Sequence, residues 1–184
     1  GDMIILDYQG ATHNNETESV LVSAGNEYEL PRPYKNDATF EGWYDSKGTR
    51  YDLSGVWGNA EIDQLTARWT EASIGLSYVT VEGGFKVAQG SFSAAELVIP
   101  EWHNGQPVIR IGGDADKKGA FESTEIQTVV VPEGIKYIGA RAFFGVIGLT
   151  EITIPESVET IGNGAFNRCE NLKSVTILRS VVKN

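Results

Sequence analysis

Apolar and polar residues alternate along several short segments within the first 70 residues of the chain. Leu65, Ala67 and Trp69 alternate with polar neighbours, and this period of two predicts a strand with one buried face. No segment here shows the 3.6-residue apolar period of an amphipathic helix. Other β-prone segments, separated by turn residues, cover residues 3–8, 19–23, 39–45 and 50–53. The pattern predicts a small, mostly β domain. Its large aromatic side chains are expected in the core, because a small domain needs them to bury enough apolar area, and the alternative is that they form a platform for a carbohydrate.

The pattern changes near residues 71–75, and beyond them it repeats. The repeated features are an Ile-Gly pair, an Ala-Phe pair and an apolar segment of the form L-x-x-I-x-I. In the two best copies each feature recurs after 23 residues: Ile138-Gly139 and Ile161-Gly162, Ala142-Phe143 and Ala165-Phe166, Leu149–Ile154 and Leu172–Ile177. Looser copies lie in residues 94–100 and 120–132. A fixed period of this length is typical of a solenoid.

Each repeated feature has a physical role in such a solenoid. The L-x-x-I-x-I segments are expected to form parallel strands of one sheet, with their apolar residues directed to a shared interior. Pro100, Pro132 and Pro155 follow these segments, where a missing N–H group ends a strand at little cost. The glycines that follow an Ile are expected to form tight corners. The Ala-Phe pairs are expected on the opposite wall, in short helical turns with Phe143 and Phe166 inside.

Charge and composition exclude several classes of function. The chain has 184 residues and a net charge of −10, which argues against a nucleic-acid binder, because such proteins neutralise phosphates with Lys and Arg. The longest apolar run, residues 3–6, is far shorter than the roughly 20 residues needed to cross a bilayer, so we expect no membrane insertion. With two His and one Cys, the chain cannot build a zinc site from several such ligands, nor an intrachain disulfide.

No catalytic, metal or cofactor site is predicted. His13 and His103 fall in a loop and a repeat connection, and Cys169 occupies a core position of its repeat. Asp114-Ala115-Asp116 has the spacing of a calcium loop but lacks the remaining oxygen ligands, and Lys117-Lys118 would oppose a cation. No glycine-rich loop has the spacing of a phosphate-binding motif.

A ligand-binding surface is predicted on the solvent face of the repeat strands. The residues between the inward apolar positions are small, β-branched or acidic. Either they contact a ligand, or they are simply residue types that fit the solvent-exposed face of a strand. These residues are Glu96, Val98, Thr128, Val130, Glu151, Thr153, Ser174 and Thr176. The loop with Trp102 and His103 is a second candidate contact, or else a plug over the first coil.

Two family resemblances accompany these patterns. The pattern I-G-x-x-A-F-x-x-C-x-x-L-x-x-V-x-I, best preserved in residues 161–177, resembles the BspA-type leucine-rich repeat, and this likeness extends over about residues 76–177. Residues 76–90 resemble the hairpin that often opens such arrays. The segments Phe40–Tyr44, Tyr51–Leu53 and Leu65–Trp69 resemble the Listeria–Bacteroides repeat, an internalin B-repeat-type module, over about residues 3–70.

The resemblances imply an α+β, mostly β chain of two domains. A β-grasp-like module would cover residues 1–72, and a short leucine-rich-repeat solenoid with an N-terminal hairpin would cover residues 73–184. They also imply a bacterial cell-surface or secreted protein that binds a protein or glycan ligand without catalysis. The alternatives are a structural spacer with no ligand of its own and, remotely, a hydrolase.

Overall fold

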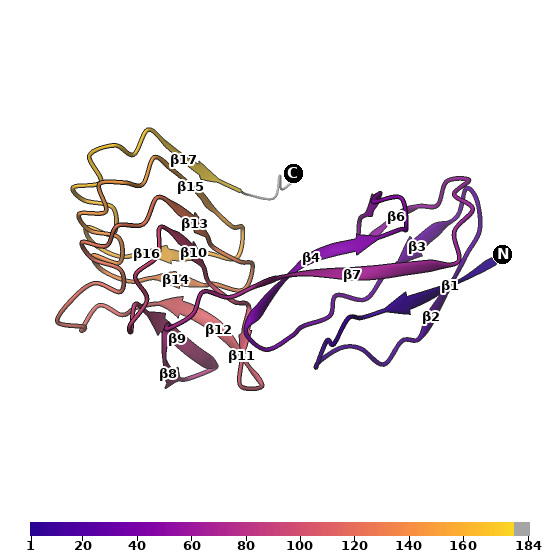
Figure 1. Cartoon of the computed structure of the whole chain (residues 1–184), viewed down its shortest axis with the longest axis horizontal. Coiled ribbons are helices and arrows are strands. Elements are labelled where there is room, and N and C mark those ends of the chain that lie inside the picture. Colours follow the sequence, from indigo (N-terminus) through magenta and orange to yellow (C-terminus); the bar gives the residue numbers. More distant parts are fainter. Residues whose placement is uncertain (179–184) are drawn as a thin grey trace. The chain divides into compact units, whose positions relative to one another are not determined.

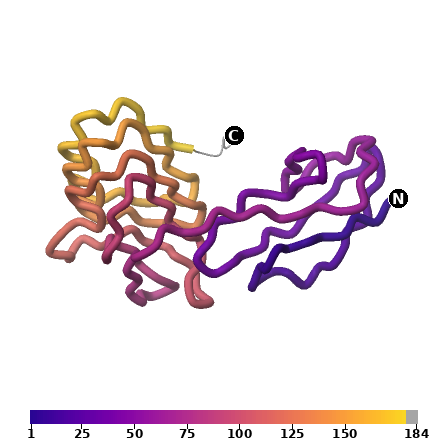
Figure 2. The backbone as a smooth tube through the Cα atoms, in the orientation of Figure 1, coloured from indigo at the N-terminus to yellow at the C-terminus, as the bar shows by residue number. Residues whose placement is uncertain are grey.

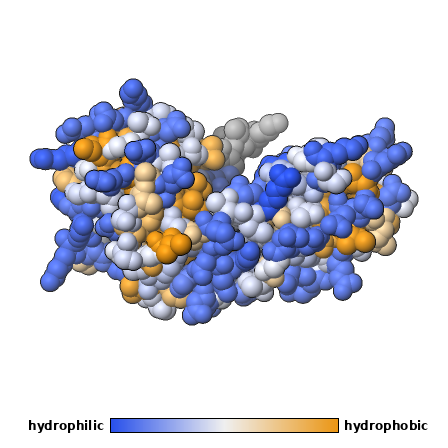
Figure 3. Space-filling view, in the orientation of Figure 1, coloured by the Kyte–Doolittle hydropathy of each residue, from blue (hydrophilic) through white to orange (hydrophobic). Residues whose placement is uncertain are grey.

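The computed structural model describes residues 1–178 and divides the chain into two compact units, Gly1–Thr70 and Glu71–Asn184. The division lies two residues before the boundary that we predicted after residue 72. The described residues form 17 strands and no helix. Accordingly, within residues 1–178 there is no helix with the length and apolar character of a membrane span. Most of the face seen in Figure 3 is hydrophilic, with smaller apolar patches on each unit.

The first unit is built around a sheet with the strand order β4-β7-β1-β2. Strand β1 pairs in parallel with β7 and antiparallel with β2, while β5 pairs with β4, and β3 and β6 form a separate antiparallel pair. The strands are β1 (Asp2–Asp7), β2 (Ser19–Val22), β3 (Glu27–Glu29), β4 (Ala38–Tyr44), β5 (Arg50–Tyr51), β6 (Ser54–Val56) and β7 (Gln64–Glu71). The short pair of β3 and β6 was not predicted, and the β-grasp-like class of this unit stays a prediction.

Aromatic side chains fill the core of the first unit, as predicted from its composition. Trp43 is fully buried, and its indole N–H donates a hydrogen bond of 2.8 Å to the carbonyl oxygen of Pro31. Tyr8 packs edge-on against this indole at 5.1 Å between ring centroids. Trp57 is also buried and stacks on Tyr51 at 5.3 Å. Buried aromatic rings with satisfied N–H groups give a small domain much of its apolar contact area.

The second unit winds in successive coils, each with one strand at the rear and one at the front (Figures 1 and 2). The rear sheet has the order β8-β9-β12-β14-β16, in which only β8 and β9 pair antiparallel. Its strands are β8 (Ser77–Val81), β9 (Gly84–Ala88), β12 (Gln106–Ile111), β14 (Tyr137–Ile138) and β16 (Thr160–Ile161). Strand β11 (Trp102–His103) pairs antiparallel with β12.

The front strands carry the predicted L-x-x-I-x-I segments. They are β10 (Glu96–Val98), β13 (Thr128–Val130), β15 (Glu151–Ile154) and β17 (Ser174–Ile177). Strand β10 pairs in parallel with β13, β15 pairs in parallel with β17, and β13 lies next to β15. In β15, Ile152 and Ile154 are buried while Glu151 and Thr153 are exposed, which is the alternation expected for a strand with one wet face. We call β10, β13, β15 and β17 the front strands.

A column of phenylalanine rings runs through the interior of the coils. Phe121 and Phe143 stack at 5.7 Å between centroids, and Phe143 and Phe166 stack at 5.6 Å with nearly parallel rings. Phe92 packs edge-on against Phe121, at the start of the column. Phe121 and Phe143 are completely buried, because each ring is covered on both sides by the neighbouring coils.

The turns that carry these rings are not helical, which corrects our prediction. The backbone N–H group of Phe121 donates to the carbonyl oxygen of Ala142, and that of Phe143 donates to Ala165, at 2.7 and 2.8 Å. These N–H groups therefore bond the next coil instead of a residue four positions earlier in their own coil. A helical turn would need hydrogen bonds between residues of the same coil. In these turns, hydrogen bonds between stacked coils take their place.

The glycines at the corners of the coils are needed mainly because neighbouring coils approach them closely. A left-handed backbone conformation is the less common reason. Of the three predicted corner glycines, Gly112, Gly139 and Gly162, only Gly112 has a left-handed backbone, with φ of +64°. A Cβ atom on Gly139 would lie 2.8 Å from the backbone nitrogen of Gly113, and one on Gly162 would lie 2.5 Å from that of Ala140. Any larger side chain at these two positions would push neighbouring coils apart.

Candidate functional site

The front strands bring the eight predicted contact residues together in two aligned rows. Glu96 lies opposite Thr128, and Val98 lies opposite Val130. In the next pair of strands Glu151 lies opposite Ser174, and Thr153 lies opposite Thr176. Seven of the eight residues are exposed, whereas Val98 is half-buried. Whether this face contacts a ligand stays a prediction.

Ser73 covers the outer edge of the first front strand at Val98. The N–H group of Val98 donates to the hydroxyl oxygen of Ser73 at 2.8 Å, and the N–H group of Ser73 donates to the carbonyl oxygen of Val98 at 3.0 Å. These bonds leave no free edge at this position of β10 for another strand to pair with.

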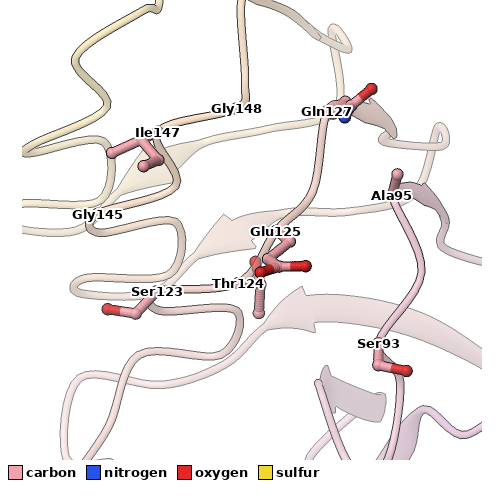
Figure 4. Close-up of a pocket in the computed structure, with 9 residues that line it drawn as sticks. All are labelled: Ser93, Ala95, Ser123, Thr124, Glu125, Gln127, Gly145, Ile147 and Gly148. Carbon is pink, nitrogen blue, oxygen red and sulfur yellow. The ribbon is translucent and has the colours of Figure 1, made fainter.

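A polar cleft of about 440 Å³ lies beside the front strands, and the sequence analysis did not find it. Three consecutive coils contribute to its walls (Figure 4). Its lining consists of Ser93, Ala95, Ser123, Thr124, Glu125, Gln127, Gly145, Ile147 and Gly148. Glu125 is the only ionisable residue among them, so the cleft suits a neutral or cationic group better than an anion.

A one-residue deletion accompanies this cleft. In the coil of Ala120, the next inward apolar residue, Ile126, follows after six residues. The corresponding separations, from Ala142 to Leu149 and from Ala165 to Leu172, are seven residues. The coil before it is shorter still, because Leu97, which pairs with Val129, follows Phe92 after five residues, whereas Val129 follows Phe121 after eight. Neighbouring coils of unequal length are expected to leave a recess in the outer surface. Comparing the repeat lengths is the sequence signal that could have predicted the cleft.

The predicted loop contacts, Trp102 and His103, belong to strand β11 and are both half-buried. The imidazole of His103 stacks on the ring of Tyr78 at 3.6 Å and lies edge-on to Phe85 at 5.0 Å. His103 is thus packed against the β8–β9 hairpin, and it is not among the residues that line the cleft. This aromatic packing supports a structural role for His103 more than a catalytic one.

The Asp114-Ala115-Asp116 loop anchors the rear sheet to the next coil. Asp114 accepts hydrogen bonds from the hydroxyl group of Tyr137 and from the backbone N–H of Ala140. Asp116 accepts hydrogen bonds of 2.7 Å from the ammonium of Lys86 and 2.8 Å from the N–H of Gly113. Every carboxylate oxygen of the pair therefore faces a protein donor, and the lysine beside Asp116 would repel a cation.

Cys169 occupies a core position in the last coil, as predicted. Its thiol is buried and donates to the carbonyl oxygen of Phe143 at 3.0 Å. Burial raises the pKa of Cys169 above that of a free thiol, so less of the reactive thiolate is present at neutral pH. These properties are those of a packing residue and not of a nucleophile.

The bonds to Asp114 predict a stability that depends on pH. The hydroxyl of Tyr137 and the N–H of Ala140 lower the pKa of Asp114 in the folded chain. A carboxyl whose pKa is lower when folded stabilises the fold above its ordinary pKa, near 3.9, and this contribution is lost as the pH falls through the folded value. Asp114→Asn is expected to lower the melting temperature at pH 7, and the difference from wild type should shrink between about pH 4 and pH 2.

Thermal melts of both chains across this pH range measure the difference, and Tyr137→Phe supplies the matched variant. Removal of this hydroxyl takes away the donor with the largest effect on Asp114, so Y137F should show the same trend with pH. A difference between D114N and wild type that stays constant down to pH 2 would contradict this interpretation.

The stacked parallel strands, each with its L-x-x-I-x-I segment, define a leucine-rich-repeat architecture for the second unit. Residues 117–184 match the family model described as "BspA type Leucine rich repeat region (6 copies)". The match covers a part of the chain that includes β13, β15 and β17, and it supports the repeat type predicted from the sequence. It leaves out residues 1–116, where the resemblance to the Listeria–Bacteroides repeat stays a prediction.

No curated protein matches the chain. The crystal structure of the T. pallidum leucine rich repeat protein, TpLRR, is a similar solved structure. The two chains align with 18% sequence identity over 55% of this chain and 68% of that chain, with a TM-score of 0.31. At this TM-score the likeness supports no conclusion about function.

Proposed function

We propose that the second unit is a non-catalytic recognition module of a bacterial cell-surface or secreted protein, and that the front strands form its contact surface. The observation that carries the proposal is the alignment of the exposed side chains in two rows on one face. The match to the BspA-type repeat model supports it, because such repeats typically serve in adhesion or protein interaction. The proposal therefore includes a location at the cell surface or outside the cell.

The chemistry of the face favours a protein partner with exposed basic groups. Glu96 and Glu151 are the charged residues of the two rows, and both are exposed. The other exposed members are threonines, a serine and a valine, which lose little side-chain entropy when a partner covers them. A mildly acidic, rigid face attracts basic groups and offers hydroxyls for hydrogen bonds.

The second candidate function is that of a structural spacer, and one observation favours it. None of the eight residues on the face is an aromatic residue or an arginine, the types that most often dominate binding energy. A spacer needs only a solvent-exposed strand surface that stays hydrated, and small polar residues are sufficient for that.

A binding screen against host glycans and extracellular-matrix proteins separates the two candidates. If the face binds a partner, Thr153→Arg is expected to weaken binding at least tenfold, because a long cationic side chain would protrude from the centre of the rows. Thr160→Arg is the matched control, since Thr160 is equally exposed but lies on β16 of the rear sheet. Binding that T160R reduces as much as T153R does, or no binding at all, would favour the spacer.

A further inference from the structure

The polar cleft beside the front strands contains acceptor groups that the described part of the chain leaves unsatisfied. Within that part, the carboxylate of Glu125 has no hydrogen bond or ion pair, and the carbonyl oxygen of Thr124 receives no donor. Figure 4 shows Glu125 near the middle of the labelled residues, with Ser93, Ser123 and Gln127 around it. The side chains of these three residues are exposed and likewise have no hydrogen bond to the described residues. The cleft therefore offers one negative charge and several oxygen atoms to an incoming donor.

The cleft is open because one coil carries glycines where the next coil carries long side chains. Gly145 and Gly148 line the cleft, and the residues 23 positions later in the repeat are Arg168 and Asn171. The side-chain amide of Asn171 donates to the carbonyl oxygen of Ile147 at 2.8 Å and so links two coils. Gly148 has no side chain with which to link its coil to the coil before it, and the space that such a side chain would fill belongs to the cleft.

The missing link between the coils indicates the chemistry of a ligand. Thr124 precedes the inward Ile126 by two positions, as Ile147 precedes Leu149, so its carbonyl oxygen corresponds to the one that an asparagine amide bonds in the last coil. A ligand that brings N–H groups can take the place of this amide. Glu125 is the next residue in the chain, and its carboxylate favours a ligand whose N–H groups belong to a cation.

Arginine is the side chain whose head group matches these acceptors. Its guanidinium group carries five N–H donors in one plane, has no acceptor and stays charged at any pH at which proteins fold. Its aliphatic stem can pack on Ile147, an apolar residue of the lining that is 56% exposed. The carboxylate of Glu125 disfavours an anion, and the lining has no aromatic ring on which a sugar could stack.

The cleft continues into a second groove, which gives room to the residues next to such an arginine. This groove has a volume of about 700 Å³ and shares Ser93 and Ala95 with the cleft. Its lining includes Ile74, which is 93% exposed, and the exposed carboxylate of Glu96. A site that extends in this way suits a segment of a protein chain better than a small free cation.

We propose that the cleft is a specificity pocket for an arginine side chain on an extended segment of a partner protein. The guanidinium group donates to the carboxylate of Glu125 and to the carbonyl oxygen of Thr124, in the place that an asparagine amide occupies one coil later. The proposal rests on the proposed function, because it requires a protein partner, but it assigns the selective contact to the cleft and not to the front strands.

A nuclear magnetic resonance titration of the ¹⁵N-labelled full chain tests the proposal. The probe is the capped pentapeptide Gly-Ser-Arg-Ser-Gly, which is expected to bind with a dissociation constant of ~1 mM. The amide signals of Glu125, Gly145 and Gly148 should move with the peptide concentration. The same peptide with citrulline in place of arginine is the matched probe, since citrulline has nearly the same shape but no charge, and it should bind at least about tenfold more weakly.

Two variants locate the bound arginine. Glu125→Gln keeps the shape of the cleft but removes its charge, and it should weaken binding of the arginine peptide about tenfold. Gly148→Asn places in the cleft the side chain that the last coil already accommodates, so it should abolish binding while the chain stays folded in thermal melts. Glu159→Gln is the matched control, because it removes an exposed carboxylate just before β16 of the rear sheet and should bind like wild type.

Thr153→Arg separates this proposal from the function on which it rests. Thr153 does not line the cleft, so T153R should still bind the arginine peptide. A partner from the screen whose binding T153R weakens, but E125Q and G148N do not, would leave the front strands as the contact surface and overturn the pocket. Equal binding of the arginine and citrulline peptides, or no change in the three amide signals at ~10 mM peptide, would also overturn it.

Discussion

Phe143→Ala is expected to lower the free energy of unfolding of the second unit by about 3–5 kcal/mol. The ring of Phe143 is fully buried and stacks on Phe121 on one side and on Phe166 on the other. Its removal leaves a cavity between three coils, and the hydrogen bonds between the turns prevent the coils from closing it. Urea denaturation followed by circular dichroism measures the change.

Phe144→Ala is the matched control for this loss. Phe144 follows directly in the sequence, but it is only half-buried and lies under the guanidinium of Arg141 at 3.7 Å. Its removal should cost at most about 1–2 kcal/mol, because it opens no internal cavity. Equal losses in the two variants would mean that the ring column does not form the core of the coils.

Trp43→Ala is expected to destabilise the first unit by a similar amount, about 3–5 kcal/mol. The indole is fully buried, Tyr8 and Phe40 pack edge-on against it, and its N–H group bonds the carbonyl oxygen of Pro31. The variant loses the largest fully buried side chain of this unit and leaves that carbonyl oxygen without its donor. Amide hydrogen exchange in β4 and β7 should therefore speed up strongly.

Trp69→Ala provides the comparison in the first unit. Trp69 donates to the carbonyl oxygen of Tyr8 at 3.0 Å but is only half-buried, so its removal should accelerate exchange less. If W69A speeds exchange in β4 and β7 as much as W43A does, burial of Trp43 does not determine the stability of this unit.

The repeat pattern predicted the front strands well because their alternation follows directly from burial. Ile152 and Ile154 must face the interior and Glu151 must face water, and no other arrangement satisfies all three residues. The aromatic core of the first unit was predictable for a similar reason, since Trp43 is too large and apolar to remain outside a small domain.

The turns could not be predicted in the same way, because their conformation is decided by a neighbouring coil. The N–H group of Phe143 bonds Ala165, which lies 22 residues further along the chain, and no local pattern reports such a bond. The same holds for Gly139, where contact with the backbone at Gly113 and not its own φ angle excludes a side chain.

The candidate site was predictable only in part. The exposed rows follow from the alternation of Thr153 and its equivalents, but a pattern of exposure does not reveal what a surface binds. The cleft beside Ser123 and Gln127 depends on the lengths of three successive coils taken together.

The recurrence of the same contacts at a 23-residue interval has an evolutionary consequence. Each coil of the second unit touches only the coils before and after it, and Ile138 and Ile161 occupy the same place in their respective coils. An in-frame tandem duplication of 23 codons in this part of the gene would therefore add one layer whose inner surfaces already match both neighbours. The height of the stack can grow by genetic copying alone, without new complementary mutations elsewhere in the chain.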